Sequence, residues 1–206
     1  MHTEILSPEQ VGLLPTMRLF RKEFYLVGGT AIALQLGHRR SIDFDMFTPK
    51  PFGARRVLNV LEKAGKNVTI TRRVSEQLNL TMDGVTVTFF EYPYAVKADV
   101  DDVNFRLPDL LSLAAMKAFA LGRRSKWKDY VDLFFLLRDR FRLPEIIERA
   151  EGIFGNEFSA KLFRSQLSYH ADINYSEKVD YMTGYAVEED AVKAALVDKA
   201  LEGVIK

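Results

Sequence analysis

The sequence predicts an α/β domain over residues 1–106, followed by an α-helical domain over residues 107–206. Between residues 68 and 90, apolar and polar residues alternate with a period of two, which is typical of half-buried strands. From Pro108 onward the apolar residues recur at helical spacing instead. The strand signals cease near Arg106, so we place the domain boundary there.

The composition is that of an ordinary globular protein. The chain has 206 residues, of which 48% are apolar and 28% charged, and this is enough for a hydrophobic core without disulfides. It contains no cysteine, which excludes a disulfide framework and a thiolate metal site. The net charge of +1 excludes a generally basic nucleic-acid binder, so RNA would have to contact a local patch. Neither a signal peptide nor a membrane-spanning run is visible, so we expect a cytoplasmic protein with no membrane partner.

Local signals assign the individual elements. Ser7 followed by Pro8 is typical of a helix start, and Pro15 is expected to break or bend that helix. Asp83-Gly84 between two alternating runs predicts a tight β-hairpin. The strands are expected at 24–27, 42–47, 68–72, 78–82 and 85–90, and the later helices at 30–36, 54–64, 109–121, 128–138, 144–153, 157–168 and 188–204.

The strongest candidate for chemistry is Gly28-Gly29-Thr30 followed by the pair Asp43 and Asp45. Glycines let a phosphate chain approach the backbone closely, and Thr30 opens a helix whose N-terminus favours anions. The two aspartates are two residues apart on an expected strand, so both carboxylates face one side. Hard oxygen ligands suit Mg²⁺, with Mn²⁺ as an alternative, rather than zinc. Each motif alone is often only a turn or a solvated strand face, but together they predict a site for a nucleoside triphosphate and a metal ion.

The stretch from Tyr25 to Phe47, Tyr-Leu-Val-Gly-Gly-Thr-Ala-Ile-Ala-Leu-Gln-Leu-Gly-His-Arg-Arg-Ser-Ile-Asp-Phe-Asp-Met-Phe, closely resembles the nucleotidyltransferase AbiEii/AbiGii toxin family. That family belongs to the DNA polymerase β-like nucleotidyltransferase superfamily. A second match follows, with Lys117 on one helix and Asp-x-x-Asp at 129–132 on the next. The resemblance covers roughly residues 20–140. It implies a mixed β-sheet flanked by helices, with the helical domain completing an active-site cleft.

The resemblance also implies roles for individual residues. The glycine turn and Thr30 would hold the triphosphate, the strand carboxylates would hold the metal, and the lysine would contact the phosphates. One of the two helical aspartates would complete the site. The implied catalytic residues are Asp43, Asp45, Lys117, Asp129 and Asp132; the implied nucleotide-binding residues begin with Gly28, Gly29 and Thr30.

The residues themselves also single out Lys117. It lies in an otherwise apolar helical run, and a buried charge there would need a partner; the alternative is that it reaches solvent. Asp129 and Asp132 are spaced i, i+3 and share a helix face. Asp129 could instead face the helix dipole, and the apolar run after Asp132 favours a place nearer the interior.

One position departs from the superfamily pattern. Many members carry a third acidic residue on a later strand, which can act as a base for the attacking hydroxyl. Here Thr88 occupies the aligned position, and Glu91 is the carboxylate nearby. The base is then Glu91, or a group of the helical domain, or none is needed. The departure also leaves open a degenerate family member that binds nucleotide or a partner protein without catalysis.

Two basic segments offer further contacts. Arg39 and Ser41, between the glycine turn and the acidic strand, could bind nucleotide phosphates, whereas for Arg40 we favour a solvated place. The run 123–128 combines four cations with Trp127, which would suit a single-stranded RNA such as a tRNA end. A charged loop between helices is the alternative for that run.

The implied reaction is attack of an acceptor hydroxyl on the α-phosphorus of a triphosphate, with release of pyrophosphate. Members of the resembled family are typically the toxin half of bacterial toxin–antitoxin or phage-defence systems, and some transfer nucleotides to the 3′ end of tRNA. The expected partners are therefore a nucleoside triphosphate, tRNA or another RNA acceptor, and an antitoxin protein. A protein or small-molecule acceptor stays open.

Overall fold

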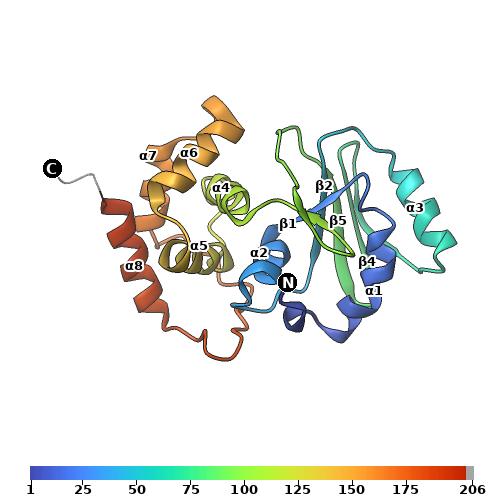
Figure 1. Cartoon of the computed structure of the whole chain (residues 1–206), viewed down its shortest axis with the longest axis horizontal. Helices are drawn as coiled ribbons and strands as arrows, with labels where there is room; N and C mark the ends of the chain where they lie inside the picture. Colours follow the sequence, from blue (N-terminus) through green and yellow to red (C-terminus); the bar gives the residue numbers. More distant parts are fainter. Residues whose placement is uncertain (203–206) are drawn as a thin grey trace. The chain divides into compact units, whose positions relative to one another are not determined.

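The computed structural model describes residues 1–202 and divides into two compact units, Met1–Asp109 and Leu110 onward (Figure 1). The first unit contains a β-sheet with helices, and the second is helical. The first unit extends three residues past Arg106, because β7 (Arg106–Leu107) pairs with β6 (Val100–Asp101). In the described part of the chain, no helix is both long enough and apolar enough to cross a membrane.

The sheet of the first unit is mixed. Its strand order is β1-β2-β5-β4-β3. Strands β2 and β5 run parallel, and the other neighbouring pairs are antiparallel. The expectation of a mixed sheet flanked by helices is thus confirmed. The strands are β1 (Tyr25–Val27), β2 (Phe44–Thr48), β3 (Thr69–Arg73), β4 (Gln77–Met82) and β5 (Val85–Glu91).

The two faces of this sheet differ because the side chains alternate. In β2, Phe44 and Met46 are fully buried, whereas Asp45 and Phe47 are half-buried on the opposite face. Strands β4 and β5 alternate in the same way. Helices α1 (Pro8–Arg18) and α3 (Ala54–Lys63) lie on one side of the sheet (Figure 1). The half-buried face therefore carries the polar groups, Asp45 among them.

Local sequence signals explain several boundaries. Ser7 and Gln10 form the capping box that starts α1. Helix α2 (Gly28–Leu36) ends at Gly37, whose φ of 72° is the left-handed conformation that glycine tolerates best. Asp83 and Gly84, with φ of 49° and 81°, form the tight turn expected between β4 and β5.

Two predicted helix boundaries differ clearly from the structure. Helix α1 continues through Pro15 to Arg18, because proline removes only one intrahelical bond and the packing of Leu13 and Met17 holds the helix on both sides of it. The helix expected from residue 157 begins at Ala160, because the Ser159 hydroxyl accepts a hydrogen bond from the Leu162 amide and caps it there.

The second unit packs its helices around α4 and α5. Helix α4 packs against α5 and α6, and α8 packs against α5 and α7. The rings of Phe119 and Phe154 stack 3.9 Å apart between α4 and α6. The end of the helix expected over 188–204 lies outside the described residues. The helices are α4 (Leu110–Leu121), α5 (Trp127–Asp139), α6 (Leu143–Phe154), α7 (Ala160–Ser168) and α8 (Glu189–Leu201), with short 3-10 turns at Thr3–Ile5 and Gly155–Glu157.

Two glycines with open space around them allow a test of how backbone conformation, rather than packing, determines the effect of a substitution. Gly12 lies within α1 and Gly84 in the hairpin turn at φ 81°, and a Cβ atom would meet nothing within 4 Å at either place. We expect Gly12→Ala to stabilise the protein by about 0.5–1 kcal/mol, because alanine restricts the unfolded chain. We expect Gly84→Ala to destabilise it by about 1 kcal/mol through its positive φ. Thermal unfolding of both variants is the measurement, and shifts of the same sign would contradict the assignment.

Candidate active site

Three polar side chains pack against the turn between β1 and α2. Gly28 has a φ of 72°, and a Cβ atom on it would lie 2.3 Å from Oδ2 of Asp45. A Cβ atom on Gly29 would lie 2.5 Å from Nη2 of Arg39 and 3.2 Å from Oγ of Ser41. The glycines therefore leave room for the protein's own side chains, in addition to the phosphate chain expected from the sequence.

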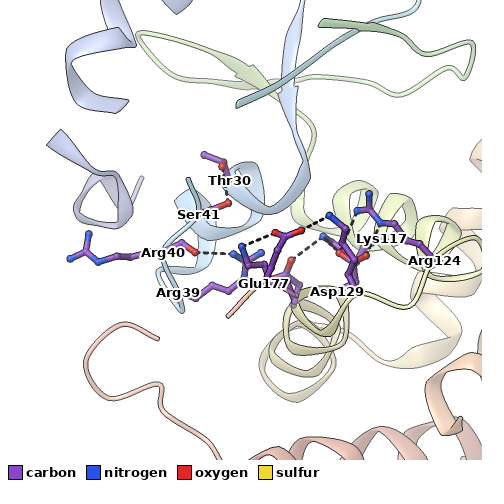
Figure 2. A network of polar contacts seen from close by, with 11 residues as sticks. Thr30, Arg39, Arg40, Ser41, Lys117, Arg124, Asp129 and Glu177 are labelled. Atoms are coloured by element: carbon purple, nitrogen blue, oxygen red, sulfur yellow. Dashed lines mark hydrogen bonds and ion pairs between the residues drawn. The ribbon is translucent and has the colours of Figure 1, made fainter. Parts of the chain in front are cut away.

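Thr30 holds this turn against the segment that precedes β2. Its side chain is buried, and its hydroxyl shares a hydrogen bond of 2.9 Å with Oγ of Ser41 (Figure 2). It also donates to the backbone carbonyl of Asp43. Thr30 thus fixes the position of both Ser41 and Asp43 relative to the start of α2.

Arg39 is the cation beside the glycine turn. Its side chain is only 1% exposed, and its Nη1 donates to the carbonyl of Arg40 at 2.8 Å. A guanidinium held this firmly would present a fixed positive charge at the N-terminus of α2, where an anion is also favoured by the helix dipole. Arg40 is exposed instead, in agreement with the solvated place favoured from the sequence.

The two aspartates are two residues apart in the chain, but only Asp45 belongs to a strand. Strand β2 begins at Phe44, so the strand expected from residue 42 starts two residues later. The reason is that the Asp43 carbonyl accepts a hydrogen bond from Thr30 and is not committed to the sheet. Both carboxylates are half-buried, on residues two apart.

Thr88 is the direct neighbour of Asp45 across the sheet. In the parallel pairing of β2 with β5, Asp45 lies opposite Thr88. The position where an acid was expected from the superfamily is thus beside Asp45, and a hydroxyl occupies it. Glu91 lies three residues further along β5, opposite Thr48, so strand alternation directs it to the other face.

An aromatic row that the sequence reasoning missed lies on the face of Asp45. Phe47 and Phe90 are register partners, one alternation step from Asp45 and Thr88, and both are half-buried. Their ring centroids are 5.1 Å apart, and the Tyr92 ring lies 5.0 Å from Phe47. The period of two in each strand was the signal that could have revealed it.

In the second unit, Lys117 on α4 lies between the two aspartates of α5. Its Nζ is 2.7 Å from Asp129 and 3.0 Å from Asp132, and all three side chains are at most 5% exposed (Figure 2). Arg124 pairs with Asp129 from the other side, at 2.9 Å. Burial by itself would raise the pKa of Asp129, but the Lys117 ammonium and the Arg124 guanidinium outweigh it and hold that pKa below its ordinary value. Both aspartates are therefore paired, and neither is merely a dipole partner.

The structure favours the interpretation of the basic run 123–128 as a charged loop between helices, rather than as a surface that binds RNA. Trp127 is buried, 7% exposed, and lies near the Tyr130 and Tyr175 rings, so it offers little surface for stacking a base. The cations of the run have acidic partners, which are Glu157 for Arg123, Asp129 for Arg124, and Glu177 for both Lys126 and Lys128.

The first unit offers two candidate carboxylate ligands for a divalent ion, Asp43 and Asp45. Within residues 1–202 there is no group of three or more acidic, histidine or cysteine side chains gathered as a metal site. Asp43 and Asp45 alone suit magnesium, which is commonly held by one or two carboxylates together with water and substrate phosphates. They would not suit a structural zinc ion, which takes four protein ligands.

Comparison with known proteins identifies the family. The model of the family described as "Nucleotidyl transferase AbiEii toxin, Type IV TA system" matches residues 16–172. The chain belongs to this family. The resemblance read from the glycine turn and the aspartates is thereby confirmed, and membership places the chain among nucleotidyl transferase toxins.

Individual relatives agree with the AbiEii assignment. An uncharacterized protein of Aquifex aeolicus (strain VF5) is 36% identical over 121 residues, a match that covers 56% of this chain and 58% of that protein. MenT4, a nucleotidyltransferase toxin of Mycobacterium tuberculosis H37Rv, shares the fold at 16% identity and a TM-score of 0.62, covering 93% of this chain and 81% of that one. JHP933 from Helicobacter pylori does so at 16% identity and a TM-score of 0.55, over 95% and 91% of the two chains.

The buried charges of this AbiEii family member give a stability prediction. Lys117→Met would leave two buried carboxylates without their shared ammonium, so we expect a loss of about 3–5 kcal/mol of unfolding free energy. Adding Asp132→Asn should restore part of that loss, because one uncompensated charge disappears. Urea unfolding of the single and double variants measures it. A single variant within about 1 kcal/mol of wild type would mean that the ion pairs contribute little.

The Glu177 contacts give a pH prediction. Hydrogen bonds from Lys126, and then from Lys128, outweigh burial and lower the pKa of Glu177 to about 2, from an ordinary value of 4.5. Because the folded pKa is depressed, the stability contributed by this carboxylate is present above pH 4.5 and is lost as the pH falls toward 2. Glu177→Gln should therefore melt below wild type at pH 6, and the gap should close on acidification. A gap that stays constant down to pH 3 would contradict this origin.

Proposed function

We propose that this chain transfers a nucleotide from a nucleoside triphosphate to an acceptor hydroxyl, with magnesium held by Asp43 and Asp45. The observation that carries the proposal is the contact of Asp45 with the glycine turn, where a Cβ atom on Gly28 would lie 2.3 Å from the carboxylate. A carboxylate thus lies directly at the N-terminus of α2, where phosphates are favoured. A cation bound there would touch the protein and the substrate together.

The triphosphate would bind at the start of α2. This helix has nine residues, and its N-cap, Val27, provides no side-chain hydrogen bond to the first turn. Backbone amides there suit an anion, and the Arg39 guanidinium beside Gly29 adds a fixed positive charge. Ser41 and Thr30 would act chiefly by fixing the turn, because they bond to each other.

The reaction would proceed by in-line displacement. The acceptor oxygen forms a bond to the α-phosphorus while the bond from that phosphorus to the bridging oxygen breaks, and pyrophosphate leaves. Magnesium would neutralise the charge on the phosphates. The residues around the turn contribute positioning, since they hold Asp45 and Arg39 in place before substrate binds.

The group that accepts the proton of the attacking hydroxyl is not expected to come from β5. The Thr88 hydroxyl is not a base at neutral pH, and Glu91 is directed to the opposite face of the sheet. We therefore favour a group of the helical unit, or transfer to water, over Glu91. For Lys117 we keep the phosphate-directed role implied by the family, with Asp129 and Asp132 holding its charge in place.

The acceptor we propose is an RNA end, such as that of a tRNA. Phe47 and Phe90 lie one alternation step from Asp45 and Thr88, which corresponds to about 7 Å along the strand. Aromatic rings on a sheet face are a common platform for unpaired bases. A toxin role, with control by an antitoxin, is supported by the family. Assay of each labelled triphosphate with total RNA would identify the nucleotide used.

A second candidate is a degenerate member that binds nucleotide without transfer. Thr88 beside Asp45 is the observation that favours it, because the site then has two carboxylates, Asp43 and Asp45, where many superfamily members have three. In that case a triphosphate would bind with magnesium while no acceptor became labelled.

Removal of the negative charge of Asp45 distinguishes a nucleotidyltransferase from a protein that only binds nucleotide. We expect Asp45→Asn to lower transfer of label from a triphosphate to RNA by at least about 100-fold, since coordination of the metal supplies several kcal/mol of transition-state stabilisation. Asp83→Asn makes the same change in the exposed hairpin turn and should transfer like wild type. Label transfer is measured with magnesium at matched melting temperature. Equal transfer by wild type and Asp45→Asn would place the activity elsewhere.

A further inference from the structure

A cavity of about 660 Å³ lies in the first unit, at the end of β2 opposite to the glycine turn. Its walls come from the segment after α1, from the loop between β2 and α3, and from the first turns of α3. Neither the glycines nor the aspartates of the candidate active site line it. A volume of this size falls within the range of small-molecule sites, roughly 300–1,000 Å³.

The rim of this cavity is cationic. Lys22, Lys50, Arg56 and Arg106 line it, against one carboxylate, Glu23. Arg106 is held in place, because its Nε donates to the carbonyl of Arg21 at 2.8 Å. Glu23 forms an ion pair with Arg56 and offsets only part of the positive charge. The rim therefore favours an anion.

The start of α3 adds to this preference. The helix has ten residues, and its N-cap, Gly53, lines the cavity and provides no side-chain hydrogen bond to the first turn. The amides of a first turn carry the positive end of the helix dipole and suit a phosphate oxygen. Arg56, in the first turn of the helix, also lines the cavity.

The interior of the cavity is aromatic. Phe20, Phe24 and Phe52 line it, and the rings of Phe24 and Phe52 meet edge to face at 5.3 Å. Phe52 is half-buried and directly follows Pro51; the rings of Pro49 and Pro51 restrict the loop that carries it. An aromatic wall beneath a cationic rim suits a base joined to a phosphate better than phosphate alone.

We propose that this cavity binds a nucleoside phosphate, with its base against Phe52 and its phosphate between Arg56, Lys50 and the start of α3. The site is separate from the proposed active site. Thr48, on its wall, lies three residues along β2 from Asp45, about 10 Å away, on the opposite face of the sheet. The nucleoside phosphate could be a free nucleotide or one unit of a bound RNA strand. The proposal does not depend on nucleotidyl transfer.

Equilibrium dialysis of the full chain with labelled AMP, in EDTA, tests the cavity without the proposed metal site. Arg56→Gln and Lys50→Gln should each weaken AMP binding about tenfold, as expected for loss of one charged contact. Arg55→Gln is the matched control, because Arg55 is an exposed neighbour on α3 that does not line the cavity. Glu23→Gln should strengthen binding, since it removes the one carboxylate. Asp45→Asn should bind AMP as wild type does.

The base and the source of the ligand are tested separately. Phe52→Ala should weaken AMP binding while leaving the weaker binding of inorganic phosphate unchanged. A pentamer of adenylate that binds more tightly than AMP, with the same dependence on Phe52 and Arg56, would identify an RNA strand as the source. AMP that binds at least as tightly would identify a free nucleotide.

Three results would overturn the proposal. The first is no AMP binding at millimolar concentration in the wild-type chain. The second is an equal loss in Arg55→Gln and Arg56→Gln, which would indicate diffuse attraction only. The third is binding of a hexaglutamate peptide in place of AMP, which would assign the cavity to an acidic protein partner. All exposed-site variants should melt within about 2 °C of wild type, because such substitutions rarely change stability by more than about 0.5 kcal/mol.

Discussion

The close approach of Asp45 to Gly28 is the contact on which the candidate site depends. The carboxylate occupies the space where any other residue would carry its Cβ atom, and the φ of 72° at Gly28 excludes most residues for a second reason. At the next residue, a Cβ atom on Gly29 would lie 2.5 Å from Nη2 of Arg39. The two glycines thus allow a carboxylate, Asp45, and a guanidinium, Arg39, to lie close to the backbone at the N-terminus of α2. The fold brings them there before any substrate binds, and preorganised charge of this kind is what metal-assisted phosphoryl chemistry requires.

In the second unit, buried charged groups are held in place by ion pairs. Lys117 lies at 2.7 and 3.0 Å from two buried carboxylates, and Arg124 contributes a second cation to one of them. The desolvation of these groups is costly, so such a cluster adds little net stability and is best understood as fixing one arrangement of α4 and α5. Substitution of Lys117 by a neutral residue would consequently disturb the packing of the unit. Loss of activity in such a variant is evidence for a phosphate contact only if the variant still folds.

Sequence reasoning succeeded where one local interaction decides the outcome. Asp83-Gly84 predicted its turn and Ser7 its cap, because each depends on residues that are neighbours in the chain. It failed at Asp43, whose exclusion from β2 depends on a hydrogen bond from Thr30 thirteen residues away. It could identify Asp129 and Asp132 as a pair on one face, but not that Lys117 lies between them. The aromatic row and the cavity depend on strand register and on loop packing, which no single segment encodes.

Thr88 has a consequence for how the proposed metal would bind. Its position opposite Asp45 leaves Asp43 and Asp45 as the two proposed carboxylate ligands. Affinity for a hard cation decreases when fewer charged ligands are present. Magnesium also keeps several waters unless phosphate oxygens replace them. The triphosphate would then supply the charge that a third carboxylate supplies elsewhere, and the Arg39 guanidinium would favour that triphosphate over a free metal ion. Metal and nucleotide would therefore bind together rather than in sequence. The absence of a third acid would then be compatible with catalysis, and the proposed enzyme would depend on its substrate to assemble the site.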